Sequence, residues 1–155
     1  METIDKTTEV LNDLLKINND RIEGYEKAAN ETDELYLKTL FRNMADESRK
    51  NAVELSREIN KLGGEPAADS TTTSGKIYRV WMDLKTTFTG KDKEAVLNSC
   101  EFGEDAAQNA YQTALSKDDD ISFAVRDLIH KQQLKLKESH DLIRDYRDTS
   151  RIEKK

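Results

Sequence analysis

The sequence is poor in the residues that interrupt helices and in the residues that fill β-sheet cores. It contains one proline and six glycines, and only 6% of its residues are aromatic. Proline and glycine are the residues least favourable to helix, so their scarcity favours long helices. The apolar share of 35% and the charged share of 36% are typical of amphipathic helices with charged outer faces. These features exclude a wide β-sandwich, and a chain of 155 residues suits a single domain over 1–155 with one core.

Other absences exclude several kinds of partner and site. Cys100 is the one cysteine, so no intrachain disulfide can form. The net charge of −6 disfavours binding to a nucleic-acid backbone, which lysine and arginine must neutralise. No apolar run approaches the roughly 18 residues of a membrane span, and the N-terminus lacks the apolar region of a signal peptide. Glycine-rich phosphate loops, nucleophile elbows and Cys/His zinc patterns are also missing. We therefore expect a soluble, cytoplasmic protein that binds neither nucleic acid nor membrane.

Apolar residues recur at spacings of three and four along most of the chain. This pattern predicts four long helices, over about 6–29, 33–62, 92–116 and 121–147. The second helix should stop at Leu62-Gly-Gly-Glu-Pro66, since glycine ends helices and proline cannot continue them. A short helix over about 76–89 is expected within the crossover 63–91, with Trp81 as a core aromatic. The tail is expected to fray from about Thr149.

An internal repeat indicates how the helices are connected. A shift of 86 residues places Val10-Leu-Asn12 on Val96-Leu-Asn98, and Tyr25 on Tyr111. Each of these segments opens a helical hairpin, so the chain consists of a hairpin, a connector and a second hairpin. The connector is long enough to travel the length of the second helix, which is about 45 Å at ~1.5 Å per residue. The third helix should therefore run parallel to the second, which predicts an all-α four-helix bundle with one long crossover.

Several short motifs resemble those of a known superfamily. They are INND and GYEKAA between 17 and 29, LGGEP at 62–66, RVWMDLK at 79–85, CEFGEDAA at 100–107 with Tyr111, and HDLIRDYR at 140–147. Together they cover nearly the whole chain. Through these motifs the sequence resembles the ferritin-like superfamily, and more closely a bacterial ferritin-like family of unknown function. The resemblance implies the same one-crossover bundle.

Polar side chains occupy mid-helix positions where the apolar stripe calls for hydrophobic residues. They are Asn18, Glu47, Asn51, Glu104, Gln132 and His140. Because buried polar groups are costly unless hydrogen-bonded, we predict a polar layer across the bundle in which Glu104 accepts from His140, Asn18 or a tyrosine hydroxyl. Tyr25 and Tyr111 are predicted to be core aromatics with tethered hydroxyl groups. Redox relays beside a metal are the alternative interpretation of this pair.

The resemblance implies a di-metal site made of one glutamate from each of two helices and Glu-x-x-His from each of the other two. The sequence departs from that set. Asn18 stands where an acid belongs, and Lys50 follows Glu47 by three residues. Lys137 stands three residues before His140, and no Glu-x-x-His occurs anywhere.

The incomplete ligand set decides our functional expectation. We expect no cofactor and no catalytic or metal-binding residues, and a non-enzymatic interaction or stress-associated protein that acts as a homo-oligomer or with a protein partner. The alternative is a di-metal oxidase, peroxidase or iron-handling protein that holds iron or another divalent metal with Glu47, Glu104, His140 and further ligands.

Overall fold

The computed structural model describes residues 2–67, 93–116 and 121–154. Within these ranges four helices form: α1 (Glu2–Glu31), α2 (Leu35–Lys61), α4 (Lys93–Ser116) and α5 (Phe123–Lys154). Trp81 and the short helix expected over 76–89 lie outside the described residues. None of the helices in the described part is both long and apolar enough to cross a membrane.

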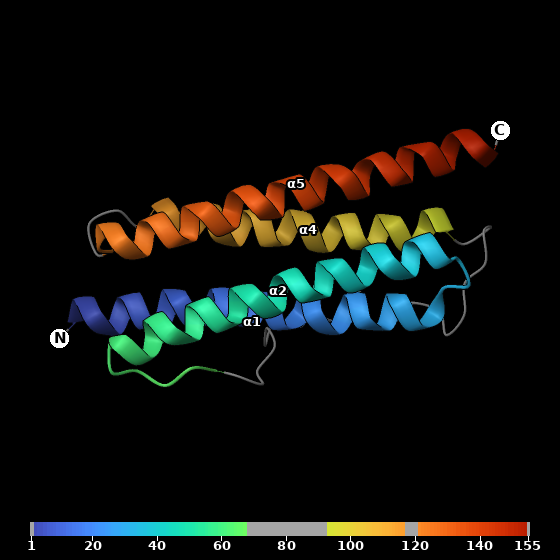
Figure 1. The fold of residues 1–155 in the computed structure, drawn as a ribbon. Helices are drawn as coiled ribbons and strands as arrows, with labels where there is room; N and C mark the ends of the chain where they lie inside the picture. The colour runs from blue at the N-terminus through green and yellow to red at the C-terminus, as the bar shows by residue number, and fades with distance from the viewer. Residues whose placement is uncertain (1, 68–92, 117–120, 155) are drawn as a thin grey trace.

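The four helices are arranged as two antiparallel hairpins (Figure 1). The first hairpin is α1 with α2, and the second is α4 with α5. Helix α4 begins at the end of the bundle where α2 begins, so α2 and α4 run parallel (Figure 1). The predicted all-α bundle with one crossover is confirmed.

Two glycines just after α2, Gly63 and Gly64, end this helix. Gly63 has a φ of 81°, in the left-handed region that costs other residues steric strain. Its amide donates to the Asn60 carbonyl at 3.0 Å, and the Gly64 amide donates to the Ile59 carbonyl at 3.0 Å, which closes the last turn. The chain then lies along α1, where the Asn12 side chain accepts a hydrogen bond from the Ala67 amide at 2.8 Å.

The apolar core falls into two clusters at opposite ends of the bundle. One cluster is centred on Tyr25, Phe41 and Leu97, and the other on Leu11, Leu55 and Tyr111. Between these clusters lie fully or almost fully buried polar side chains: Asn18, Arg21, Ser48, Asn51, Glu104 and Gln132. The polar residues thus form a middle section of the bundle interior between the two apolar ends.

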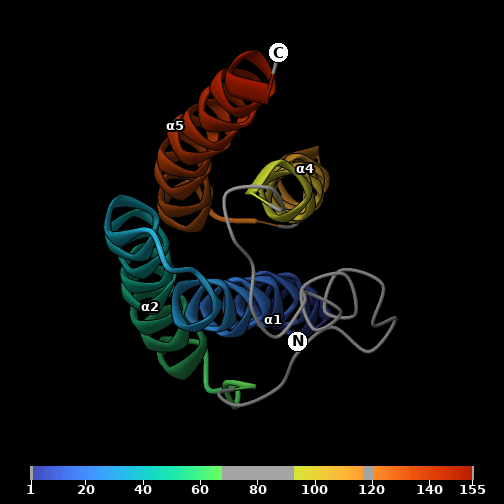
Figure 2. The same ribbon diagram turned by 90° about the vertical axis from the view of Figure 1, so that its right-hand side faces the viewer.

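Helix α5 is longer than the sequence predicts. It continues to Lys154 instead of ending near 147 and fraying from Thr149, because the tail contains no proline or glycine and several good helix formers. Viewed along the bundle, α5 diverges from α2, whereas α1 stays against α2 (Figure 2).

Candidate buried ion-pair centre

Helix α1 places four buried residues on one face of the bundle interior. Leu14, Asn18, Arg21 and Tyr25 are spaced by four, three and four residues, which keeps them on one side of a helix. All four are at most 1% exposed. An arginine therefore lies at the centre of the bundle.

The Arg21 guanidinium group contacts both carboxylates of the predicted polar layer. Its Nε donates to Glu104 Oε1 at 2.7 Å, and Nη1 lies 3.3 Å from Glu47 Oε1. Nη1 also donates to the Ser48 hydroxyl, and Nη2 lies 4.0 Å from the Met44 sulfur. The guanidinium carbon lies 5.4 Å from the centre of the Tyr25 ring. One cation thus joins α1, α2 and α4.

The carboxylates keep this arginine charged in spite of its burial. Burial by itself lowers the pKa of Arg21, but the Glu104 carboxylate beside it outweighs that effect, and the pKa is raised. A buried charge needs both a counter-charge and hydrogen-bond acceptors. Glu104, Glu47 and Ser48 supply them.

Tyr25 shares the same carboxylate oxygen. Its hydroxyl donates to Glu104 Oε1 at 2.7 Å, and burial, followed by the Glu104 charge, raises the pKa of Tyr25. The second oxygen of Glu104 is buried and has no hydrogen-bond partner among the described residues. Glu104 is therefore held through one oxygen by two donors.

Glu47 connects this centre to the surface. Its side chain is 24% exposed, and the Ser139 hydroxyl of α5 lies 2.9 Å from Oε1 and 3.2 Å from Oε2. Burial raises the pKa of Glu47, although the positive charge of Arg21 acts in the opposite direction. Two carboxylates thus share one guanidinium group.

A second network of uncharged groups lies next to the ion pairs. Asn18 donates to the Tyr111 hydroxyl at 2.9 Å, and Asn51 donates to Asn18 Oδ1 at 3.2 Å. Tyr111 donates to Gln132 Oε1 at 2.6 Å, while Gln132 donates to Glu54 at 3.0 Å. Burial raises the pKa of Tyr111, so its hydroxyl stays protonated and able to donate. This network satisfies the buried amides and joins all four helices.

The structure does not bring His140 into the layer. Its Nε2 lies 2.6 Å from Asp105 Oδ1 on α4, and its Nδ1 lies 3.1 Å from Asp141 Oδ1. The reason is helical periodicity: Ser139 follows Gln132 by seven residues, or two turns, whereas His140 follows it by eight and is rotated away. Ser139 takes the interior position that we expected His140 to occupy.

The sequence thus predicts most of the buried polar residues but not Arg21, which lies at their centre. Asn18, Asn51, Glu104 and Gln132 lie inside the bundle, with Glu47 at its edge, and the hydroxyls of Tyr25 and Tyr111 are hydrogen-bonded. Arg21 was not among the expected residues. The signal that could have found it is its spacing of three from Asn18 and four from Tyr25 on the interior stripe.

These residues do not fit the di-metal centre that the resemblance implies. Metal centres of this kind need several carboxylate and imidazole ligands around each ion. Arg21 occupies the space between the two carboxylates, and the one nearby histidine is bound elsewhere. Within residues 2–67, 93–116 and 121–154, no group of three or more histidine, cysteine, aspartate or glutamate side chains could hold a metal ion.

The four helices have the fold of a ferritin-like four-helix bundle. A family model described as "Domain of unknown function (DUF2383)" matches residues 6–117. The chain belongs to this family. No curated protein matches the chain.

Solved structures with the same fold share little sequence with this chain. The bacterioferritin-related protein of Bacteroides fragilis, a dodecameric thioferritin, has a TM-score of 0.77 and 19% identity, covering 97% of this chain and 90% of that chain. Mycobacterium smegmatis Dps has a TM-score of 0.76 and 17% identity, and the match covers 94% of this chain and 87% of that chain. A ferritin-like diiron-carboxylate protein of Bacillus anthracis has a TM-score of 0.69 and 14% identity, and the match covers 97% of this chain and 99% of that chain. At these identities the similarity shows the fold alone.

Proposed function

We propose that this protein is a non-enzymatic ferritin-like bundle in which Arg21 supplies the central positive charge that a metal ion would otherwise provide. The observation that carries the proposal is the contact of one buried guanidinium group with Glu104 at 2.7 Å and Glu47 at 3.3 Å. A cation already lies between the two acids, so the position that a metal ion would take between them is filled. The role of the centre is then to join the helices.

A protein with such a closed centre acts through its surface. We propose a homo-oligomer or a partner-binding, stress-associated protein of the bacterial cytoplasm. The proposal is supported by the bacterial origin of the similar structures and by the dodecameric thioferritin among them. Exposed apolar side chains, among them Leu35, Phe102 and Leu142, provide contact area for association.

The direct test is iron chemistry. Purified protein, loaded anaerobically with ferrous iron, is expected to consume oxygen or peroxide no faster than iron in buffer. Light scattering coupled to size-exclusion chromatography would give the number of subunits in the same preparation. Turnover that depends on the protein and disappears in Glu104→Gln would establish the metal-dependent oxidase, peroxidase or iron-handling alternative instead. A protein that stays monomeric at all concentrations would contradict the proposed homo-oligomer.

A further inference from the structure

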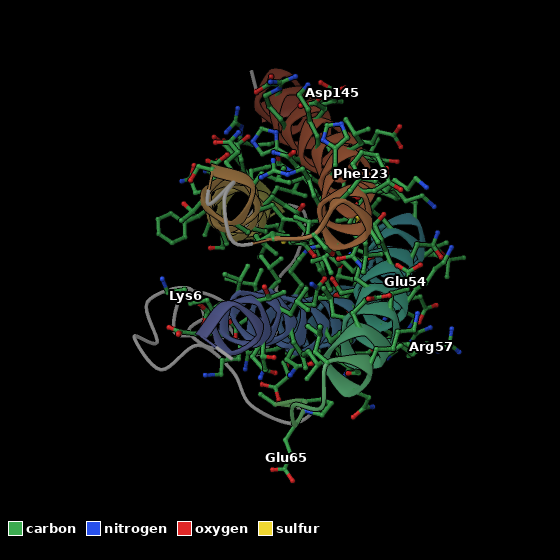
Figure 3. The ribbon with its side chains drawn as sticks, turned by 90° about the vertical axis from the view of Figure 1, so that its left-hand side faces the viewer. Lys6, Glu54, Arg57, Glu65, Phe123 and Asp145 are labelled. Atoms are coloured by element: carbon green, nitrogen blue, oxygen red, sulfur yellow. The ribbon has the colours of Figure 1, made fainter. Side chains whose placement is uncertain are left out.

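A groove with charged residues in its lining lies between α2 and α5, the two helices that diverge in Figure 2. It has a volume of about 510 Å³, within the ~300–1,000 Å³ typical of small-molecule sites. Its charged lining comprises Asp46, Glu47, Lys50, Glu54, Lys131 and Lys135. Figure 3 shows Glu54 on the side of α2 nearest to α5, whereas Arg57 points outward. Both signs of charge are therefore present in one small groove.

The groove reaches the buried centre through Glu47. With Glu47, Glu104 and Arg21 all ionised, two carboxylates face one guanidinium group, and the centre carries one net negative charge. The nearer partner of Arg21 is Glu104, at 2.7 Å compared with 3.3 Å for Glu47. Glu47 is thus the carboxylate with incomplete charge compensation, and it lines the groove. A half-buried carboxylate of this kind favours a cationic group beside it.

Two lysines in the lining have no ion-pair partner among the described residues. Lys50 belongs to α2 and Lys135 to α5, and both are exposed. In contrast, Lys131 pairs with Asp127 at 2.9 Å. Unpaired lysine ammonium groups favour an anionic group of a ligand.

Hydrogen bonds on either side place these lysines at one level of the groove. Glu47 is joined to Ser139 across the two helices, and the Asn51 carbonyl accepts from Gln132. Because α2 and α5 are antiparallel, Lys50 and Lys135 fall between these two cross-connections, within one turn of Glu47. The Glu47 carboxylate, which favours a cation, therefore lies near the two lysines, which favour an anion.

Ligands of a single charge sign fit this groove poorly. A simple anion would meet the carboxylates of Glu47 and Glu54, and an organic cation would meet the lysines. A metal ion would find no cluster of three acidic, histidine or cysteine ligands in the described part of the chain. We propose that the α2–α5 groove binds a small zwitterion of the amino-acid class, with its ammonium group at Glu47 and its carboxylate group between Lys50 and Lys135. This inference rests on the proposed metal-free centre, because a bound metal would supply the missing positive charge.

The test is an NMR titration of the full-length protein. Glycine, 4-aminobutyrate and 6-aminohexanoate vary the separation of the two charges, while butylamine and butyrate each carry one. At least one zwitterion is expected to shift the amide resonances of the groove residues and to bind about tenfold more tightly than either single-charge compound, which corresponds to ~1.4 kcal/mol.

Variants separate the groove from other surface charges. Glu47→Gln, and separately Lys50→Ala with Lys135→Ala, are expected to weaken binding about tenfold or more. Glu138→Gln removes an exposed acid of α5 outside the groove lining, so binding should not change. The lysine variants alter exposed side chains only and preserve the fold, which keeps the test valid even if Glu47→Gln unfolds.

Equal affinity for zwitterions, butylamine and butyrate would overturn the proposal, as would no binding of any zwitterion at millimolar concentration. Elemental analysis of the same sample distinguishes two failures. Absent binding in a metal-free protein rejects the groove site alone. Stoichiometric metal that disappears in Glu104→Gln rejects the proposed function.

Discussion

A guanidinium group is stable inside a protein only when its charge and its donors find partners there. Arg21 is fully buried, and its partner Glu104 is fully buried as well. For such pairs the desolvation cost is close to the gain from attraction, so removing one member is far more damaging than replacing both. The stability of this centre therefore depends on both residues together.

Substitution of Arg21 tests this dependence. Arg21→Met should lower the free energy of unfolding by about 3–5 kcal/mol, because Glu104 remains buried without its cation. Replacing Arg21 by Met and Glu104 by Leu together should recover most of that loss. Urea denaturation of the two single variants and the double variant measures the coupling energy.

The matched control is Arg49→Met. Arg49 pairs with Glu26 at 2.7 Å, but its side chain is 46% exposed, so its loss should cost at most about 1 kcal/mol. If Arg21→Met were as harmless as Arg49→Met, the buried ion pair would not hold the centre together.

His140 gives the protein a predictable pH dependence. Carboxylates only accept hydrogen bonds, so contacts from both ring nitrogens to Asp105 and Asp141 require the doubly protonated ring. Burial acts to lower the pKa of His140, but the hydrogen bonds to Asp141 and Asp105 outweigh it and the pKa is raised. The contact therefore stabilises the folded state fully below the unfolded pKa of about 6.5 and is lost as pH rises through the folded pKa.

Thermal melting at a series of pH values checks the sign. The melting temperature of the unmodified protein should fall from about pH 6.5 upward, and His140→Gln should remove that part of the slope. His130→Gln changes the only other histidine, which is exposed, and should leave the slope intact. A slope that persists in His140→Gln and disappears in His130→Gln would refute the assignment.

At the scale of the helices, the close contact at the end of α2 makes a steric prediction. A Cβ added to Gly64 would lie 2.6 Å from Thr8 Cγ2 on α1 and 3.2 Å from Ile59 Cγ2. Gly64→Ala should therefore lower the unfolding free energy by about 1–3 kcal/mol, the usual cost of overpacking. Adding Thr8→Ala removes the nearest atom and should recover part of that loss in chemical denaturation. A Gly64→Ala variant as stable as the parent would contradict the close approach of this turn to α1.

The helices could be predicted from the sequence, because apolar spacing and the two glycines after Leu62 leave few alternatives. The centre could be predicted only in part. Asn18 and Glu104 stand out as polar residues on an apolar stripe, but an arginine on a charged helix resembles a surface residue unless its register is followed residue by residue. Ser139 and His140 are adjacent on α5, and which of them faces the interior depends on the exact rotation of the helix about its axis. The residue types alone do not reveal that rotation.

At the scale of the whole molecule, the polar section separates two apolar clusters and joins all four helices. Apolar contacts tolerate sliding of one helix along another. The bonds from Arg21 to Glu104 and Glu47 and from Tyr111 to Gln132 instead fix each helix at one level. We therefore predict that the double variant Arg21→Met with Glu104→Leu retains its helix content but shows broader NMR resonances than the parent. Equally sharp spectra would show that the polar section does not select the helix register.

The most direct test of Arg21 as the central cation is a crystal structure of the protein soaked in ferrous and zinc salts, with anomalous data at both metal edges. The result we predict is guanidinium density between Glu47 and Glu104, without an anomalous peak at that position. An anomalous peak bridging the two carboxylates, with the Arg21 side chain turned away, would contradict the account.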